Sequence, residues 1–229
     1  MILHRFDIVD STQTLARRYA EAGAPHGTVV LAEAQTAGRG RRGREWRSPP
    51  GSGLTFSIIL RPPGPARDAA LLTLGAAAGL ALALDARVKW PNDLVDPDGH
   101  KLGGLLAELE TDGDIIRYVL LGVGLNVHQV DFPSDLPNAT SLTRLHGPQD
   151  REEVLDRATA AILAWCAHPG RIDLWRQRAH TLGRQVRIGA VSGVARGLRD
   201  DGALLVDGVA VTTGEVEADP LTRPRATEA

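Results

Sequence analysis

A twelve-residue stretch, QTAGRGRRGREW at 35–46, constrains the fold of this chain more than any other feature of its sequence. It contains the spacing G-x-G-x-x-G, which is the fingerprint of dinucleotide-binding folds. In those folds a helix follows the glycines directly, and an acidic residue stands about twenty positions later. Here the chain continues as RSPPG at 47–51, which cannot begin a helix cleanly, and the later position falls in RPPG at 61–64. A Rossmann fold is therefore excluded.

The same stretch concentrates positive charge in a chain whose formal net charge is only -2. Glycines let a backbone approach a ligand closely, and successive free N–H groups form a concavity that binds anions. Arginine forks bind phosphate oxygens in pairs. The stretch predicts a loop that closes over a phosphate-bearing ligand. Two other interpretations stay open at this point, a nucleic-acid-binding arm and a solvated surface loop.

Composition narrows the class of protein. The chain has 229 residues, of which 43% are hydrophobic, and its charge is nearly balanced, so global charge predicts no nucleic-acid partner. A single cysteine, Cys166, excludes an intramolecular disulfide and is expected in the core. No signal peptide is recognised, and the longest apolar run, 69–84, is shorter than the roughly 20 residues that a membrane span needs. We expect a cytoplasmic protein that binds no membrane.

Apolar periodicity and turn residues predict an α+β fold. Strands are expected at 2–9, 28–34, 54–60, 87–90 and 115–127, with a hairpin of 94–95 and 101–110 around Asp98-Gly99. Helices are expected at 11–23, 66–85, from Asp150 to 167, and up to 181. Short strands with glycine turns follow at 185–188, 191–198, 203–206 and 209–213, which indicates a small SH3-like barrel. The predicted boundaries are 1–182, 183–223 and a tail at 224–229.

Four further motifs carry polar side chains, and two of them also contain glycines. They are STQ at 11–13, KWPND at 89–93, KLGG at 101–104 and GVGLN at 122–126. Each has an ordinary structural explanation when it is taken alone. Ser11 can cap a helix, PND can form a turn, Lys101 can be a solvated cation, and a strand glycine can mark a bulge.

Taken together and in this order, these motifs resemble the biotin protein ligase family, in its short form without an N-terminal DNA-binding domain. GVARGLRDDGALLV at 193–206 also resembles the small barrel of that family. The resemblance covers nearly the whole chain. It implies a catalytic domain of the class II aminoacyl-tRNA-synthetase-like, biotin–lipoyl ligase type, with a mixed sheet, followed by the barrel.

The resemblance also implies a two-step ligation. The biotin carboxylate attacks the α-phosphate of ATP to give biotinyl-5′-AMP, and a lysine of an acceptor protein then displaces AMP. Biotin and ATP are substrates, Mg²⁺ accompanies the phosphates, and no metal ligand is expected from the chain. An anion that attacks a polyanion needs fixed cations to cancel the repulsion, and the arginines, Lys89 and Lys101 supply them.

Residue roles follow from the resemblance, position by position. The implied catalytic residues are Lys101 and Arg41. The implied biotin-binding residues are Ser11, Thr12, Gln13, Gln35, Arg39, Gly40, Arg41, Lys101, Gly103 and Gly104. The implied ATP-binding residues are Arg41, Arg44, Trp46, Lys89, Asn92 and Asn126. Many family members have asparagine where this chain has Gln13, and Glu45 places an acid inside the basic stretch.

The implied partner is the biotin carrier domain of an acetyl-CoA or related carboxylase. Because the first strand begins at Ile2, we expect no DNA-binding domain and no DNA partner. The sequence leaves monomer and homodimer open. Lipoate-type ligation is disfavoured by Gln35 and the arginine-glycine loop. A nucleic-acid-binding module without enzymatic activity would leave KWPND and Lys101 unexplained.

Overall fold

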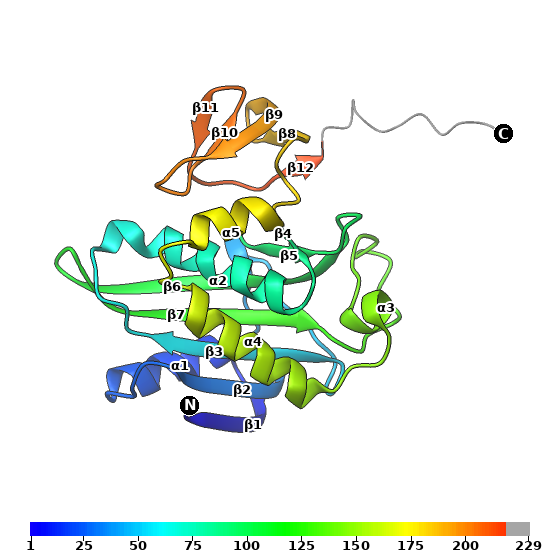
Figure 1. The fold of residues 1–229 in the computed structure, drawn as a ribbon. Helices are drawn as coiled ribbons and strands as arrows, with labels where there is room; N and C mark the ends of the chain where they lie inside the picture. Colours follow the sequence, from blue (N-terminus) through cyan, green and yellow to red (C-terminus); the bar gives the residue numbers. More distant parts are fainter. Residues whose placement is uncertain (219–229) are drawn as a thin grey trace.

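A seven-stranded mixed sheet forms the centre of the computed structural model, which describes residues 1–218 (Figure 1). Its strands lie in the order β1-β2-β3-β7-β6-β5-β4, and only β1 and β2 are parallel. The bounds are β1 Leu3–Val9, β2 Thr28–Gln35, β3 Gly53–Leu60, β4 Arg87–Lys89, β5 Asp93–Val95, β6 Lys101–Asp112 and β7 Ile115–Asn126.

Helices cover both faces of this sheet, as the alternation of its buried side chains indicates. On one face Val30, Ile59 and Leu120 pack with α1, Thr12–Glu21. The residues next to these on the same strands point to the opposite face of the sheet, into the larger core. That core contains α2 Ala69–Ala83, α4 Arg151–Trp165 and α5 Arg171–Arg178. Because side chains alternate between the faces of a strand, every residue of β3 is buried. The sheet is thus the middle of three layers.

The apolar helix α2 packs through two glycines. A Cβ atom on Gly79 would lie 2.6 Å from Trp165 Cβ, and one on Gly75 would lie 2.5 Å from the Trp165 carbonyl oxygen. The backbone of α2 therefore lies directly against α4. By length and composition alone, the segment Ala66–Ala83 could cross a membrane, but 50% of it is buried inside the structure. It occupies the position of a core helix.

A five-stranded antiparallel sheet follows α5, with strand order β11-β10-β9-β8-β12. Its strands are β8 Gln185–Ile188, β9 Val191–Leu198, β10 Leu204–Val206, β11 Val209–Val211 and β12 Glu217–Ala218. It lies above α2 in Figure 1, and Trp90 Nε1 donates to the Gly202 carbonyl oxygen at 3.2 Å. A Cβ on Gly202 would lie 2.9 Å from Leu74 of α2, so the two parts are closely packed there.

Most predicted elements are confirmed, including the hairpin of β5 and β6 and the capping of α4 by Asp150, which accepts from the Glu152 and Glu153 N–H groups. The helix expected at 66–85 begins as a 3₁₀ turn, Ala66–Asp68, and ends at Ala83. Ser11 occupies the N-cap position of α1, but its side chain makes no capping hydrogen bond. The expected tail, 224–229, and residues 219–223 of the expected barrel lie outside the described residues.

His180, between α5 and β8, should make stability depend on pH. Burial, followed by the charges of Arg184 and Lys89, lowers its pKa from 6.5 to about 4. The unfolded chain therefore takes up this proton first, and stability should fall as pH decreases from about 6.5 to about 4. Because the imidazole is only half-buried and solvent screens its charge, the loss should be well below the roughly 3 kcal/mol that a shift of this size gives a fully buried group. Urea unfolding of the parent and of His180→Gln across this range measures it, and equal pH slopes would contradict the assignment.

Candidate active site

The arginine-glycine loop leaves β2 and folds back on itself as a small hairpin. Gly40 N–H donates to the Arg44 carbonyl oxygen at 2.7 Å, and Trp46 N–H donates to that of Gly38 at 3.0 Å. A Cβ on Gly38 would lie 2.3 Å from the Trp46 carbonyl oxygen, and Gly43 has a φ of 74°. Both positions therefore need glycine, for close approach in one case and for a left-handed backbone in the other.

Each of three loop arginines is held by an acceptor from outside the loop. Arg39 pairs with Glu108 of β6 at 3.1 Å. Arg44 pairs with Glu215, which lies between β11 and β12. Arg41 donates to Asn92 Oδ1 at 3.0 Å and to the Gly214 carbonyl oxygen at 3.3 Å.

Arg41 differs from the other two because both of its hydrogen-bond acceptors are neutral. Burial lowers the pKa of its guanidinium, against the opposing effect of the Asp93 charge. Arginine nevertheless stays protonated in proteins. Arg41 is thus a partly buried cation whose hydrogen bonds leave its charge available to an anion.

A cavity of about 720 Å³ lies under the loop. Its walls are residues 37–45, Leu106 and Glu108 of β6, and Thr213 beside β11. The predicted residues Arg39, Gly40, Arg41 and Arg44 all line it. A pocket with this concentration of arginine is suited to a ligand with several negative charges.

Neutral polar groups lie at the N-terminus of α1. Gln35 Oε1 accepts from Thr12 N at 2.8 Å and from Thr12 Oγ1 at 3.1 Å. Ser11, Thr12 and Gln13 are each 3% exposed, so this polar group is covered in the structure. The Thr12 hydroxyl and the Gln35 amide are therefore in contact, although α1 and β2 separate them in the chain.

The glycines of β7 provide the surface on which Trp46 lies. A Cβ on Gly124 would lie 2.3 Å from the indole ring of Trp46, and only a residue without a side chain leaves that space. Trp46 Nε1 is buried and has no hydrogen-bond partner among the described residues. The indole is thus placed against the sheet, with an unused donor.

A second group of predicted residues meets at the turn between β4 and β5. Lys101 Nζ lies 2.8 Å from Asp93 Oδ1. Asn92 Nδ2 donates to the Leu105 carbonyl oxygen at 2.6 Å, while its Oδ1 accepts from Arg41. Lys89 is largely buried, and this burial lowers its pKa. These contacts join the KWPND turn, the start of β6 and the loop in one polar cluster.

Three other predicted residues, Asn126, Gly103 and Gly104, hold strands together in the structure. Asn126 Nδ2 donates to the carbonyl oxygens of Thr140 at 3.0 Å and Lys101 at 3.4 Å, which fixes the end of β7. A Cβ on Gly103 would lie 2.3 Å from the Gly124 carbonyl oxygen, and one on Gly104 would lie 3.2 Å from Asp93 Oδ1. Both glycines therefore allow close packing of β6 with its neighbours.

Sequence reasoning missed four residues that hold the site together. Asp93 could have been found, because it stands in the KWPND motif. Glu108 stands in KLGGLLAE, also a quoted motif. Gly214 and Glu215 carry no local signal, since they meet the loop only through the fold.

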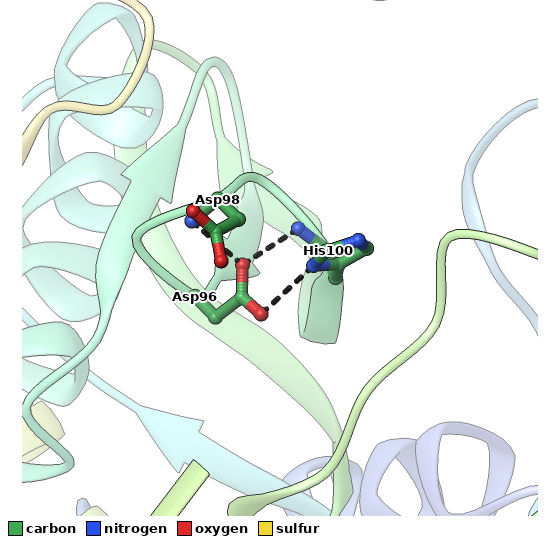
Figure 2. Close-up of side chains that lie close together, drawn as sticks. All are labelled: Asp96, Asp98 and His100. Carbon is green, nitrogen blue, oxygen red and sulfur yellow. Dashed lines mark hydrogen bonds and ion pairs between the residues drawn. The ribbon is translucent and has the colours of Figure 1, made fainter. Parts of the chain in front are cut away.

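One group of acidic and histidine side chains lies outside this site. Figure 2 shows Asp96, Asp98 and His100 in the turn between β5 and β6, with spacing that could hold a metal ion. Asp96 Oδ1 accepts from the N–H groups of Asp98 and His100 at 3.0 and 2.8 Å, and its Oδ2 lies 3.0 Å from His100 Nδ1. Asp96 is thus fully engaged in holding the turn.

The fold and site define an α+β protein with an arginine-lined cavity beneath a glycine-rich loop, and comparisons with known proteins identify its relatives. Residues 5–126 match the model of the biotin/lipoate A/B protein ligase family. The biotin–[acetyl-CoA-carboxylase] ligase of Paracoccus denitrificans is 36% identical, with 88% of this chain and 92% of the relative covered. That of Mycobacterium tuberculosis is 35% identical over 93% and 88%. The chain belongs to the biotin/lipoate A/B protein ligase family.

A solved structure agrees with this assignment. The biotin protein ligase of Aquifex aeolicus, in complex with biotin and ATP, has a TM-score of 0.77 and is 29% identical. The match covers 94% of this chain and 97% of that one. The likeness therefore includes both sheets of the described structure.

The Arg39–Glu108 contact should hold the loop in place. Glu108→Gln keeps a hydrogen-bonding group but removes the charge, so the loop should open more often. Because a partly exposed ion pair contributes up to about 1 kcal/mol, trypsin should cleave after the loop arginines about two- to fivefold faster. Glu110→Gln is the control, since Glu110 pairs with Arg17 of α1 but not with the loop. Equal cleavage rates in the two variants would remove Glu108 from this role.

Proposed function

We propose that this chain is an ATP-dependent biotin ligase. It forms biotinyl-5′-AMP from biotin and ATP, and then transfers biotin to one lysine of a biotin carrier domain of an acetyl-CoA or related carboxylase. The names of the two curated relatives and the biotin and ATP of the Aquifex aeolicus complex support this proposal.

The arrangement of side chains in the site supports the proposed reaction. The site combines two kinds of recognition surface, a cation-lined cavity and a neutral group of hydroxyls and amides beside it. Arg41 and Arg44 suit the phosphates of a nucleotide. Thr12 and Gln35 suit the ureido ring of biotin, which has N–H donors and a carbonyl acceptor. A ligand that is neutral at one end and anionic at the other matches this arrangement.

In the first step, an oxygen of the biotin carboxylate attacks the α-phosphorus of ATP, and pyrophosphate leaves. Both reactants are anions, so fixed cations must cancel their repulsion. Lys101, ion-paired with Asp93, is proposed to contact the carboxylate and the α-phosphate. Arg41 and Arg44 are proposed to bind phosphate, with Lys89, Asn92 and Asn126 contributing nucleotide contacts. Mg²⁺ is expected to enter with ATP as part of the substrate.

In the second step, the ε-amine of the acceptor lysine attacks the acyl carbon of the mixed anhydride. The bond from this carbon to the phosphate oxygen breaks, AMP leaves, and the amine loses a proton. The adenylate hydrolyses readily in water, so the site must exclude solvent until the acceptor arrives. The loop, with Trp46 placed against β7, is proposed to provide this cover.

Four assignments belong to the same proposal. The catalytic domain would span 1–182, and the five-stranded sheet would be an SH3-like barrel in a domain spanning 183–223. The location would be cytoplasmic. The carrier domain would be the only macromolecular substrate, without DNA, and monomer and homodimer are equally compatible with the proposed reaction.

Calorimetric titration with biotin, followed by ATP and Mg²⁺, tests the proposal as a whole. Mass spectrometry should then identify biotinyl-5′-AMP as the retained small molecule. Binding of lipoate or octanoate in place of biotin would instead move the chain to the lipoate branch of its family, and binding of none of these acids would refute the proposed reaction.

Lys101→Ala should lose most of its adenylation activity while it still folds. Removal of one preorganised charge from such a site typically lowers the rate by about 10²–10³. Pyrophosphate exchange measures the first step, and circular dichroism checks the fold. A variant that adenylates at the parent rate would remove Lys101 from the chemistry.

Arg41→Ala should release the adenylate prematurely. The variant loses the contacts to Asn92 and Gly214 that hold the loop between the two sheets, so the cover over the ligand should open more often. The rate at which biotinyl-5′-AMP appears in free solution, compared with the parent, measures this leakage. Unchanged retention would assign the closure of the site to other residues.

A further inference from the structure

Ser57 interrupts a strand that is otherwise suited to a hydrophobic core. It lies in the middle of β3, GLTFSIIL, where every residue is buried, and its own exposure is 0%. A buried hydroxyl must find hydrogen-bond partners or it destabilises the fold. Ser57 Oγ lies 2.9 Å from Gln13 Oε1 and 2.9 Å from Thr12 Oγ1. Both partners belong to the N-terminus of α1.

The orientation of Gln13 fixes the direction of the first hydrogen bond. Gln13 Nε2 donates to the carbonyl oxygens of Leu120 at 3.0 Å and Leu106 at 3.2 Å, so its Oε1 faces Ser57. Gly122 stands opposite Ser57 in the sheet, and a Cβ there would lie 2.7 Å from Oε1. The absence of a side chain at Gly122 thus leaves room for the Gln13 amide. Because Oε1 can only accept, the single Ser57 hydrogen is directed to it.

The second contact of Ser57 Oγ is with the Thr12 hydroxyl. With its hydrogen directed to Gln13, Ser57 Oγ can only accept from Thr12. The second acceptor within reach of the Thr12 hydrogen is Gln35 Oε1, which already accepts from Thr12 N. Gln35 is the last residue of β2, where the loop begins, whereas Ser57 is fixed in the centre of the sheet. Ser57 is therefore the more deeply buried of the two acceptors, fixed in the centre of the sheet.

We propose that Ser57 and Gln13 are positioning residues that hold the Thr12 hydroxyl as a hydrogen-bond acceptor toward the ligand. This inference rests on the proposed function. A Thr12 oxygen whose hydrogen is held by Ser57 presents its lone pairs to an N–H donor, such as a ureido nitrogen of biotin. Gln13 acts through Ser57, since its own amide is occupied by strands β6 and β7. The family resemblance implies that Gln13 binds biotin directly, whereas this proposal assigns it an indirect role.

The test measures biotin binding and turnover in Ser57→Ala. Loss of one prepositioned hydrogen bond should raise the biotin Kd and KM about tenfold, with kcat within about twofold of the parent. Thr159→Val is the matched control, because it removes a buried hydroxyl in α4 that donates only to carbonyl oxygens of its own helix. It should bind biotin as the parent does, even where both variants melt at a lower temperature.

A double-mutant cycle with Thr12→Val shows whether the effect passes through Thr12. In the Thr12→Val background, Ser57→Ala should weaken biotin binding by less than about twofold. Additive losses, or an unchanged Kd in Ser57→Ala alone, would overturn the inference. A parent protein that does not bind biotin would instead refute the proposed function, so the two failures are distinguishable.

Discussion

A patch of the central sheet without side chains is the constraint on which the site depends. Gly122 and Gly124 lie two residues apart on β7, and Gly104 of β6 pairs with Gly124, so all three point to the same face. Each has a neighbour that a Cβ would displace or crowd, namely Gln13, Trp46 and the Asp93 carboxylate. The bare backbone lets α1, the loop and the KWPND turn approach one surface. Side chains here would separate the three groups.

Electrostatics at this surface follow from local pairing rather than from net charge. The chain is almost neutral, yet its loop collects arginines over one cavity. Arg39 and Arg44 are paired with carboxylates, which stabilise the loop without a ligand. Arg41 is held by neutral groups instead, and its charge is not cancelled by its hydrogen-bond partners. A polyanion entering the cavity thus competes with the paired Glu108 and Glu215 for two arginines, whereas the third, Arg41, has no carboxylate among its hydrogen-bond partners.

The sequence was sufficient for the elements and for most of the candidate site, because both depend on local signals. Apolar runs bounded by turn residues located the strands, and Asp150 identified the start of α4. The family motifs located the loop, the KWPND turn and Lys101, although their roles remain predictions. Two elements, β12 with two residues and α3 (Leu142–His146) with five, are too short to show a periodic pattern in the sequence. Their positions are determined by tertiary contacts.

The missed residues that lie outside the motifs, Ser57 and Glu215 among them, share a physical cause. Ser57 is one hydroxyl in an apolar strand, and its importance depends on Gln13, 44 residues away in the chain. Glu215 meets Arg44 only because the five-stranded sheet packs beside the loop. Such pairs leave no spacing rule in the sequence. Reasoning from motifs finds groups that contact a ligand more readily than the groups that orient them.

The contact between the loop and the C-terminal sheet determines when the site can be completed during synthesis of the chain. Arg41 and its partner Gly214 are separated by 173 residues, and Thr213 lines the same cavity. During synthesis the loop is therefore made long before the residues that complete its surroundings. A nascent chain that has folded its central sheet still has an unfinished cavity. The site is assembled only after residues 213–215 have left the ribosome, when the strands of the central sheet have already been made.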